Sequence, residues 1–506
     1  MKSWLISASL ALVVAGAQGQ KGFGTPDLIT QADLRAHLEF LAHDLLEGRD
    51  TASRGYAIAS EYIASHLKLW GLKPAGDAGT YFQQVPFLRP RLERDSCTLT
   101  VAGQKIEWGE FGVVASRTAG GTLQGDLVYI PVDASGAPAF GSVDPKGKVW
   151  VVRKGGVSNA VIEASRAQKA AGIVELMDEG SRATANSQAR GGLRLDFGLP
   201  SRAYCPVVAI GFATGAKLLE GTGLSAKDAS TGAIASPQAI LSKLEGSISF
   251  DLGQTSCRNV LAYVEGTDPK LKQEFVMIGA HLDHLGLSNR TTGDRIYNGA
   301  DDDGSGSAAL LEIAHACSTG KRPKRSVLFI WHTGEEKGLL GSRYWTNNPT
   351  VNLSGITSMV NIDMIGRSRF PGDTKKANEN LSGPKEIYII GSNKLSSEWG
   401  ALVKKVNSGM YNMGLNRRYD APDDPERFYS RSDHFNYALK GIPVIFFFDG
   451  VHEDYHKVSD EVSTIDFAKF ELTSRTIYGI IWELSSRKNR LKVDIPLDKT
   501  ADDNDH

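Results

Sequence analysis

Acidic and histidine side chains follow several β-rich runs at the points where these runs end. EFVMIGA leads into His281 and Asp283, SVLFIWHTG into Glu335 and Glu336, SMVNI into Asp363, IPVIFFFDG into the loop with His456, and the turn GADDDGSG contains Asp301, Asp302 and Asp303. Each of them alone has an ordinary explanation as a turn, a helix cap or a surface residue. Because functional groups gather at the carboxyl ends of parallel strands, their joint placement predicts one shared site.

These residue types indicate metal-assisted hydrolysis. Zinc binds histidine nitrogen and carboxylate oxygen. A carboxylate held between two ions can bridge them, and two metals about 3.5 to 4 Å apart can stabilise both a nucleophilic water and the developing oxyanion. One further carboxylate must stay off the metals to accept the proton of that water. The adjacent pair Glu335 and Glu336 could divide these two roles.

The stretch HEDYH, residues 452–456, offers a competing zinc motif, because H-E-x-x-H on one helix places two histidines on the same face. Here the motif follows the apolar run VIFFF after an Asp449-Gly450 turn, and no amphipathic helical run contains it. Glu483, the candidate for a third ligand, lies in IIWELSS, which is typical of a packed helix. We therefore interpret His456 as a ligand, and His452 and Glu453 as loop residues.

The elements that position these residues indicate an α/β fold. From about residue 258, runs that are apolar throughout alternate with helical stretches such as SAALLEIAHAC, which predicts a mostly parallel mixed sheet with helices on both faces. Before it, ADLRAHLEFLAHDLLEG and GYAIASEYIASHLKLWG predict two amphipathic helices. GKVWVVRKGG and EASRAQKAAGIVELM predict a strand, a loop, a helix and a strand in a smaller β-rich inserted domain.

The predicted organisation has five parts. They are a signal peptide (1–19), the N-terminal part of the main domain (20–117), the inserted domain (118–235), the rest of the main domain (236–490) and a disordered acidic tail (491–506). Lys2, an apolar run and small residues before position 18 predict export to the periplasm or outside the cell, with cleavage near Ala17. The run is too short to span a bilayer, so no stable membrane insertion is expected after cleavage.

Bulk properties exclude few functions. Lysine plus arginine (57) and aspartate plus glutamate (58) nearly cancel, so no overall field attracts nucleic acid. The four cysteines, Cys97, Cys205, Cys257 and Cys317, lack a C-x-x-C pairing, and both disulfides and buried free thiols stay open. The oligomeric state is not decided by the sequence.

Taken together, the motifs HLD, GADDDGSG, TGEEKGLLGS, NIDMIG, SDHFNY and DYHKVSD resemble, in order and over about residues 275 to 465, a two-zinc exopeptidase family. That family includes bacterial leucyl aminopeptidases, glutamate carboxypeptidase II and the transferrin-receptor ectodomain. The resemblance implies a zinc exopeptidase (phosphorylase/hydrolase-like) fold and two Zn²⁺ ions per chain. It implies His281 and Asp363 on one ion, Glu336 and His456 on the other, and Asp302 bridging both.

The same resemblance assigns roles to residues beside the ions. Glu335 would be the general base, and Asp283 would orient the imidazole of His281 without binding metal. Tyr455 would help to stabilise the oxyanion, with a packed aromatic as the alternative. The peptide between Asp302 and Asp303 is expected to be cis. The inserted domain resembles a protease-associated domain, and we expect it to shape substrate access.

The implied function is an aminopeptidase that acts on peptides. Carboxypeptidases of this fold use arginine-rich pockets, and Arg417, Arg418, Arg427 and Arg431 keep that direction open. Glutaminyl cyclases of this fold bind one zinc, and the complete five-ligand set argues against them. A receptor that has lost catalysis would have degenerate ligands, whereas every ligand position here keeps a competent side chain. The preferred side chain at the cleaved residue is left open.

Overall fold

The computed structural model describes residues 22–114, 118, 120–184, 193–196, 205–421 and 423–497. These form two compact units, one built from the chain before Pro86 and after Ser256, the other from Pro86 to Ser256. The second unit is wider than the predicted 118–235. Its strand β14 (Leu244–Ile248) pairs with both β4 (Thr98–Val101) and β7 (Gly121–Gln124), so segments on each side of the predicted insert belong to it.

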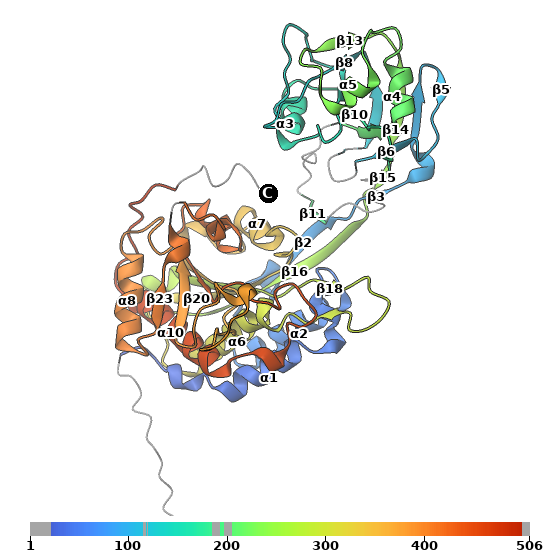
Figure 1. The fold of residues 1–506 in the computed structure, drawn as a ribbon. Coiled ribbons are helices and arrows are strands. Elements are labelled where there is room, and N and C mark those ends of the chain that lie inside the picture. The colour runs from blue at the N-terminus through green and yellow to red at the C-terminus, as the bar shows by residue number, and fades with distance from the viewer. Residues whose placement is uncertain are drawn as a thin grey trace, which may run out of the picture. The chain divides into compact units, whose positions relative to one another are not determined.

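The first unit is built on a mixed sheet (Figure 1). Its order is β2 (Phe82–Leu88), β16 (Gln254–Val264), β20 (Ser326–His332), β17 (Phe275–His281), β21 (Ile356–Ile362), β24 (Val444–Phe448), β22 (Glu386–Ile390) and β23 (Gly414–Asn416), with β1 (Lys73–Pro74) against β16. Strands β20, β17, β21 and β24 are parallel neighbours, while β16 and β22 join them antiparallel. This confirms the predicted α/β class.

Helices cover both faces of this sheet, which explains why β20, β21 and β24 are buried at every residue. On one face α6 (Gly306–Thr319) packs on β17 among α1 (Gln31–Leu41), α2 (Arg54–Leu69) and α10 (Phe467–Ser486), and α8 (Trp399–Gly409) packs on α10. On the other, α9 (His434–Ala438) contacts β21 and β24 and packs on α7 (Leu340–Asn347). Figure 1 shows α1, α6 and α10 on one side and α7 on the other.

The first predicted helix is shorter than its apolar pattern suggested. Helix α1 ends at Leu41, and the chain continues as a 3₁₀ segment from Asp44 to Arg49. Glu47, Gly48 and Arg49 all have positive φ angles, which an α-helix cannot contain. This turn brings the side chain of Arg49 into the interior, where it is 1% exposed.

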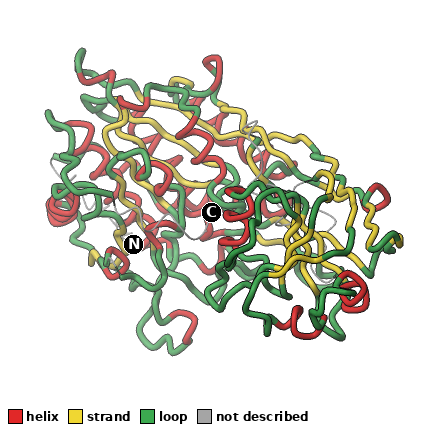
Figure 2. Tube along the Cα trace, turned by 90° about the horizontal axis from the view of Figure 1, so that it is seen from above, coloured by secondary structure: helices red, strands yellow, loops and turns green. Residues whose placement is uncertain are grey.

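The second unit contains a sheet ordered β13 (Gln238–Ile240), β8 (Leu127–Tyr129), β9 (Val149–Val152), β10 (Gly172–Leu176), β12 (Val207–Ile210) and β6 (Phe111–Val113). A second sheet joins β5 (Gln104–Lys105), β4, β14 and β7. The short strands are β3 (Arg91–Leu92), β15 (Phe250–Asp251) and β11 (Arg194–Leu195), and the helices are α3 (Asn159–Ala167), α4 (Phe212–Leu218) and α5 (Ala226–Thr231). The order β9, α3, β10 confirms the predicted strand, helix and strand. Figure 2 shows helices in red and strands in yellow along the same trace.

Several remaining expectations concern the chain ends and the cysteines. All four cysteines are free thiols, so of the two alternatives, disulfides or free thiols, the structure has free thiols. The predicted signal peptide lies outside the described residues, as do residues 498–506 of the predicted tail. The described residues 491–497 of that segment are packed on the first unit, because Leu491 is buried and Asp494 accepts a hydrogen bond from Ser397 Oγ (2.6 Å). Among the described helices, none is both long and apolar enough to cross a membrane.

Candidate metal and catalytic site

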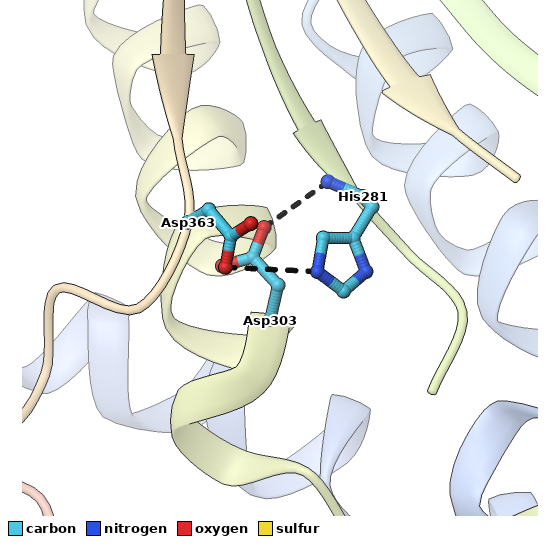
Figure 3. Close-up of side chains that lie close together, drawn as sticks. All are labelled: His281, Asp303 and Asp363. Atoms are coloured by element: carbon cyan, nitrogen blue, oxygen red, sulfur yellow. Dashed lines mark hydrogen bonds and ion pairs between the residues drawn. The ribbon is translucent and has the colours of Figure 1, made fainter. Parts of the chain in front are cut away.

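The strand ends of the main sheet bring the predicted residues together in one cleft. Its described lining includes Asp302, Glu335, Glu336, Asp363 and His456. His281 is the last residue of β17, and Asp363 directly follows β21. Figure 3 shows the two side chains pointing toward each other from neighbouring strands. Neighbouring parallel strands therefore bring these two predicted residues close together.

Asp302 lies between two groups of donor atoms. Its Oδ1 is 3.2 Å from Nε2 of His281, which is also 3.7 Å from Oδ1 of Asp363. Its Oδ2 is 3.2 Å from Nε2 of His456, which is also 3.3 Å from Oε2 of Glu336. One carboxylate thus faces two half-sites with a different oxygen toward each.

These separations fit zinc. Two ligand atoms at about 2.0 to 2.1 Å from one tetrahedral ion lie about 3.3 Å apart. The contacts of Asp302 with both histidines and that of Glu336 with His456 are 3.2 to 3.3 Å. The donor set of two imidazoles and three carboxylates also matches the ligand chemistry of zinc.

Asp303 also lies close enough to His281 and Asp363 to share an ion with them (Figure 3). Its carboxylate, however, accepts hydrogen bonds from three backbone amides, those of His281 (3.1 Å), Gly306 (2.9 Å) and Met364 (3.2 Å). A Cβ at Gly306 would lie 2.2 Å from Oδ1 of Asp303, so glycine is needed there. Asp303 therefore holds the strand ends together, and the expected cis peptide before it is present.

Glu335 is placed to act beside the half-sites. Its Oε2 is 3.9 Å from Nε2 of His281, and its backbone amide donates to Oδ1 of Asp283 (3.2 Å). Burial raises the pKa of Glu335 well above its ordinary value, and the neighbouring carboxylates of Asp363 and Glu336 raise it further. His281 lowers this pKa but does not cancel the rise. A carboxylate with a raised pKa is a stronger proton acceptor.

Asp283 contacts His281 as predicted, but through its backbone carbonyl oxygen rather than through its carboxylate. The ring Nδ1 of His281 lies 2.9 Å from the backbone carbonyl oxygen of Asp283, which leaves Nε2 facing the carboxylates. The carboxylate of Asp283 accepts instead from Thr51 Oγ1 (2.8 Å) and from the amide of Glu335. Asp283 thus positions both the histidine and the glutamate.

Asp302 and Glu336 are held as ionised carboxylates, whereas burial raises the pKa of Asp363. Burial alone would raise the pKa of Asp302, but His284, His281 and His456 hold it well below its ordinary value. Burial and Asp302 likewise oppose ionisation of Glu336, yet His284 and His456 lower the pKa of Glu336 to about 2. Both side chains are therefore negatively charged and able to bind a cation.

Tyr455 lines the cleft and stacks on the ring of His456, with centroids 3.9 Å apart. Burial, together with the carboxylates of Asp302 and Glu336, raises the pKa of Tyr455 above its ordinary value. The hydroxyl group therefore stays protonated near neutral pH and can donate a hydrogen bond.

The HEDYH segment is not helical but forms turns after β24. Nε2 of His452 points to Oδ2 of Asp301 (3.2 Å), Glu453 pairs with Lys375 (2.6 Å), and Asp454 pairs with Arg367 (2.8 Å). Of the five residues, Tyr455 and His456 reach the site. His452, Glu453 and Asp454 fasten the loop that presents them, in agreement with the interpretation of His452 and Glu453 as loop residues.

Of the four arginines considered for a carboxypeptidase pocket, Arg431 lines the cleft. Arg417 donates to the carbonyl oxygen of Gly400 (3.0 Å), and Arg418 donates to Oδ1 of Asn380 (2.6 Å). Ser432, in the SDH segment, donates to Oδ2 of Asp363 (2.7 Å) and so orients this carboxylate. The apolar lining is Met364, Phe428, Phe446, Phe448, Val451 and Tyr455.

Arg49 and Asp460 support the site and were missed by the sequence reasoning. Arg49 donates from Nε to the carbonyl oxygen of Leu282 (2.9 Å) and from its terminal nitrogens to Asn298 (2.7 Å), Gly299 (3.0 Å) and Leu41. Asp460 accepts from the amides of Asp301 and Asp302. Because Arg49 is more than 230 residues before its partners at 282 and 298, no local pattern could have signalled its role.

We expect Arg49→Met to lower the free energy of unfolding by about 3 kcal/mol or more, because it leaves several buried carbonyl groups without a donor. The midpoint of urea unfolding measures this loss. Arg54→Met, at an exposed position, is the control and should change stability by less than about 0.5 kcal/mol. An unchanged midpoint for Arg49→Met would show that this arginine does not hold together the segments that contain Leu282 and Asn298.

Comparison with known proteins places this site in a family. Residues 259–481 match Peptidase family M28. The chain is 32% identical to leupeptin-inactivating enzyme 1 of Streptomyces exfoliatus over 250 residues (45% of this chain, 48% of the relative). It is 28% identical to leucine aminopeptidase 1 of Ajellomyces capsulatus over 229 residues (43% and 55%). The chain thus spans about half the length of these curated relatives.

A solved structure extends the likeness of fold. The aminopeptidase from Aneurinibacillus sp. strain AM-1 aligns over 94% of this chain and 98% of its own, with a TM-score of 0.52 and 19% identity. The α/β architecture is therefore shared over nearly the whole chain. Residues 259–481, which contain the site, are the part of the chain that matches Peptidase family M28.

Proposed function

We propose that this protein is an exported zinc-dependent aminopeptidase that hydrolyses N-terminal residues from peptides. The observation that supports it most is the placement of Asp302 between the pair His281 and Asp363 and the pair Glu336 and His456. Two zinc ions would be held there, one by each pair, with Asp302 shared. Relatives named leucine aminopeptidase support the same direction of cleavage.

The chain's own residues would perform the proton transfers. When bound, the zinc ions would supply a water of lowered pKa and polarise the scissile carbonyl. Glu335 takes the proton from this water as the oxygen attacks the carbonyl carbon, and it then gives the proton to the leaving amine nitrogen. The protonated hydroxyl of Tyr455 donates to the carbonyl oxygen as negative charge develops on it.

The described lining of the cleft does not contain the cluster of arginines that would bind a terminal carboxylate. Four carboxylates line it, those of Asp302, Glu335, Glu336 and Asp363, against Arg431 as the one arginine in the described lining. Arg417 and Arg418 donate hydrogen bonds to Gly400 and Asn380, so neither of them adds to an arginine-rich pocket for a terminal carboxylate.

The experiment is to compare a peptide with a free amino end, the same peptide amino-acetylated, and the same peptide carboxyl-amidated. We expect the zinc-loaded protein to cleave the first and third and to leave the acetylated peptide intact. Chelation should abolish cleavage, and added zinc should restore it. Cleavage that survives acetylation but not amidation would replace the proposal with a carboxypeptidase.

A further inference from the structure

We infer that His284 is a positioning residue that fixes the ligand Glu336 through one oxygen, so that the other oxygen is presented to the metal. The inference rests on the proposed function, because it assigns a partner to one of its ligands. His284 lies three residues after His281 in the segment HLDH, and its side chain is 0% exposed.

The two oxygens of Glu336 face different histidines. Nδ1 of His284 is 2.7 Å from Oε1, whereas Nε2 of His456 is 3.3 Å from Oε2. A separation of about 3.3 Å suits two ligands of one tetrahedral zinc, but 2.7 Å is too short for that. It is the distance of a charge-assisted contact between a ring N–H and a carboxylate. His284, Asp302 and Glu336 also offer ligand atoms close enough together for one ion. The 2.7 Å contact is what favours His284 as the residue that holds Glu336 over His284 as a further ligand.

The proton position on the His284 ring follows from its surroundings. Both ring nitrogens are buried, and neither has a hydrogen-bond partner of standard geometry among the described residues, but Nδ1 lies 2.7 Å from Oε1 of Glu336. A buried N–H without an acceptor costs more than a contact with a carboxylate, so the proton belongs on Nδ1. Oε1 of Glu336 is then the carboxylate oxygen nearest to this N–H.

The surrounding backbone fixes the ring in this place. The amide of His284 donates to the carbonyl oxygen of Arg49 (3.2 Å), and Asp50 and His284 form a parallel β-bridge. Gly299 has φ +57°, and a Cβ there would lie 2.5 Å from Cδ2 of the ring. The space for the imidazole therefore depends on glycine at this position.

Asp283 and His284, neighbours in HLDH, each contact one member of the Glu335–Glu336 pair. Asp283 accepts from the backbone amide of Glu335, and His284 contacts the carboxylate of Glu336. The segment after β17 thus holds both members of the Glu335–Glu336 pair, which follow β20. Metal partners of this kind change metal affinity about 10- to 100-fold when removed.

The test measures zinc affinity at both sites by competition with a chromophoric chelator. We expect His284→Phe to weaken one of two zinc sites by about 10- to 100-fold. His284→Asn, whose amide N–H₂ can take the place of Nδ1–H, should recover most of this affinity. The control is His434→Phe, since His434 is also fully buried but stacks on Phe446 (4.8 Å), and it should keep both sites.

The possible failures are distinguishable. Absence of zinc binding by the unchanged protein would overturn the proposed function itself. Two tight sites in the unchanged protein and in His284→Phe would overturn the inference alone. X-ray absorption of the zinc-loaded protein gives a second readout, in which we expect one imidazole per ion, and two imidazoles on one ion would make His284 a ligand instead.

Discussion

Glu335→Gln is expected to lower kcat about a thousandfold while the protein keeps its zinc, because general acid–base catalysis contributes about 10²- to 10⁴-fold. Glutamine preserves the shape of the side chain but cannot accept the proton of a water. The backbone amide of Glu335 would still donate to Asp283, so the loop after β20 should stay in place. Steady-state kinetics and zinc analysis on the same preparation measure both quantities.

The matched control for this change is Glu453→Gln, in the HEDYH segment. Glu453 pairs with Lys375 in the loop before His456 and does not line the cleft described here. Its replacement should leave kcat within about twofold, because surface ion pairs contribute little. Full activity in Glu335→Gln with loss of activity in Glu453→Gln would reverse the assignment of the general base.

Asp302→Ala is expected to weaken both zinc sites and to lower kcat/KM at least about a thousandfold, because several kcal/mol of metal stabilisation are lost. Asp302 is the residue whose two oxygens face both histidines. Isothermal titration with zinc measures the number of ions bound and their affinity. Circular dichroism checks that the fold is kept.

His456→Ala provides the comparison, because His456 contacts one half-site and its side chain is 38% exposed. We expect this variant to lose affinity mainly at one zinc site. If Asp302→Ala also weakened only one site, Asp302 would not be shared between two ions.

The parts of the site that follow apolar strands could be predicted from the sequence. His281 ends β17, Asp363 directly follows β21, and Glu336 lies in the turn after β20, so the parallel strands bring all three to one edge of the sheet. The HEDYH match could be set aside for a related reason, since the turn after β24 cannot place two histidines on one helical face. In both cases the residues next to the motif in the sequence were enough for the prediction.

Other contributions depend on contacts between distant segments. Arg49 enters the core only because positive φ angles end α1 early, and the apolar pattern of that stretch predicted a longer helix. For His284 the signal was present, since HLDH holds a second histidine beside the first, but only the distance to Glu336 gives it a role. Asp283 shows the same limit, because sequence cannot tell a carboxylate contact from a carbonyl contact.

The limits of the second unit were also beyond local pattern. Strands β4 and β14 are more than 140 residues apart in the chain and pair with each other. The stretch near residue 235 is a loop inside this unit, which extends from Pro86 to Ser256. Pairing between such distant strands is set by the whole sheet and not by the residues at a turn.

The most direct test of the account is anomalous X-ray diffraction at the zinc edge from crystals of the zinc-loaded protein. We expect two peaks on opposite sides of the Asp302 carboxylate, one beside His281 and Asp363, the other beside Glu336 and His456. A single peak between His452 and His456 would contradict this account and make HEDYH the metal site.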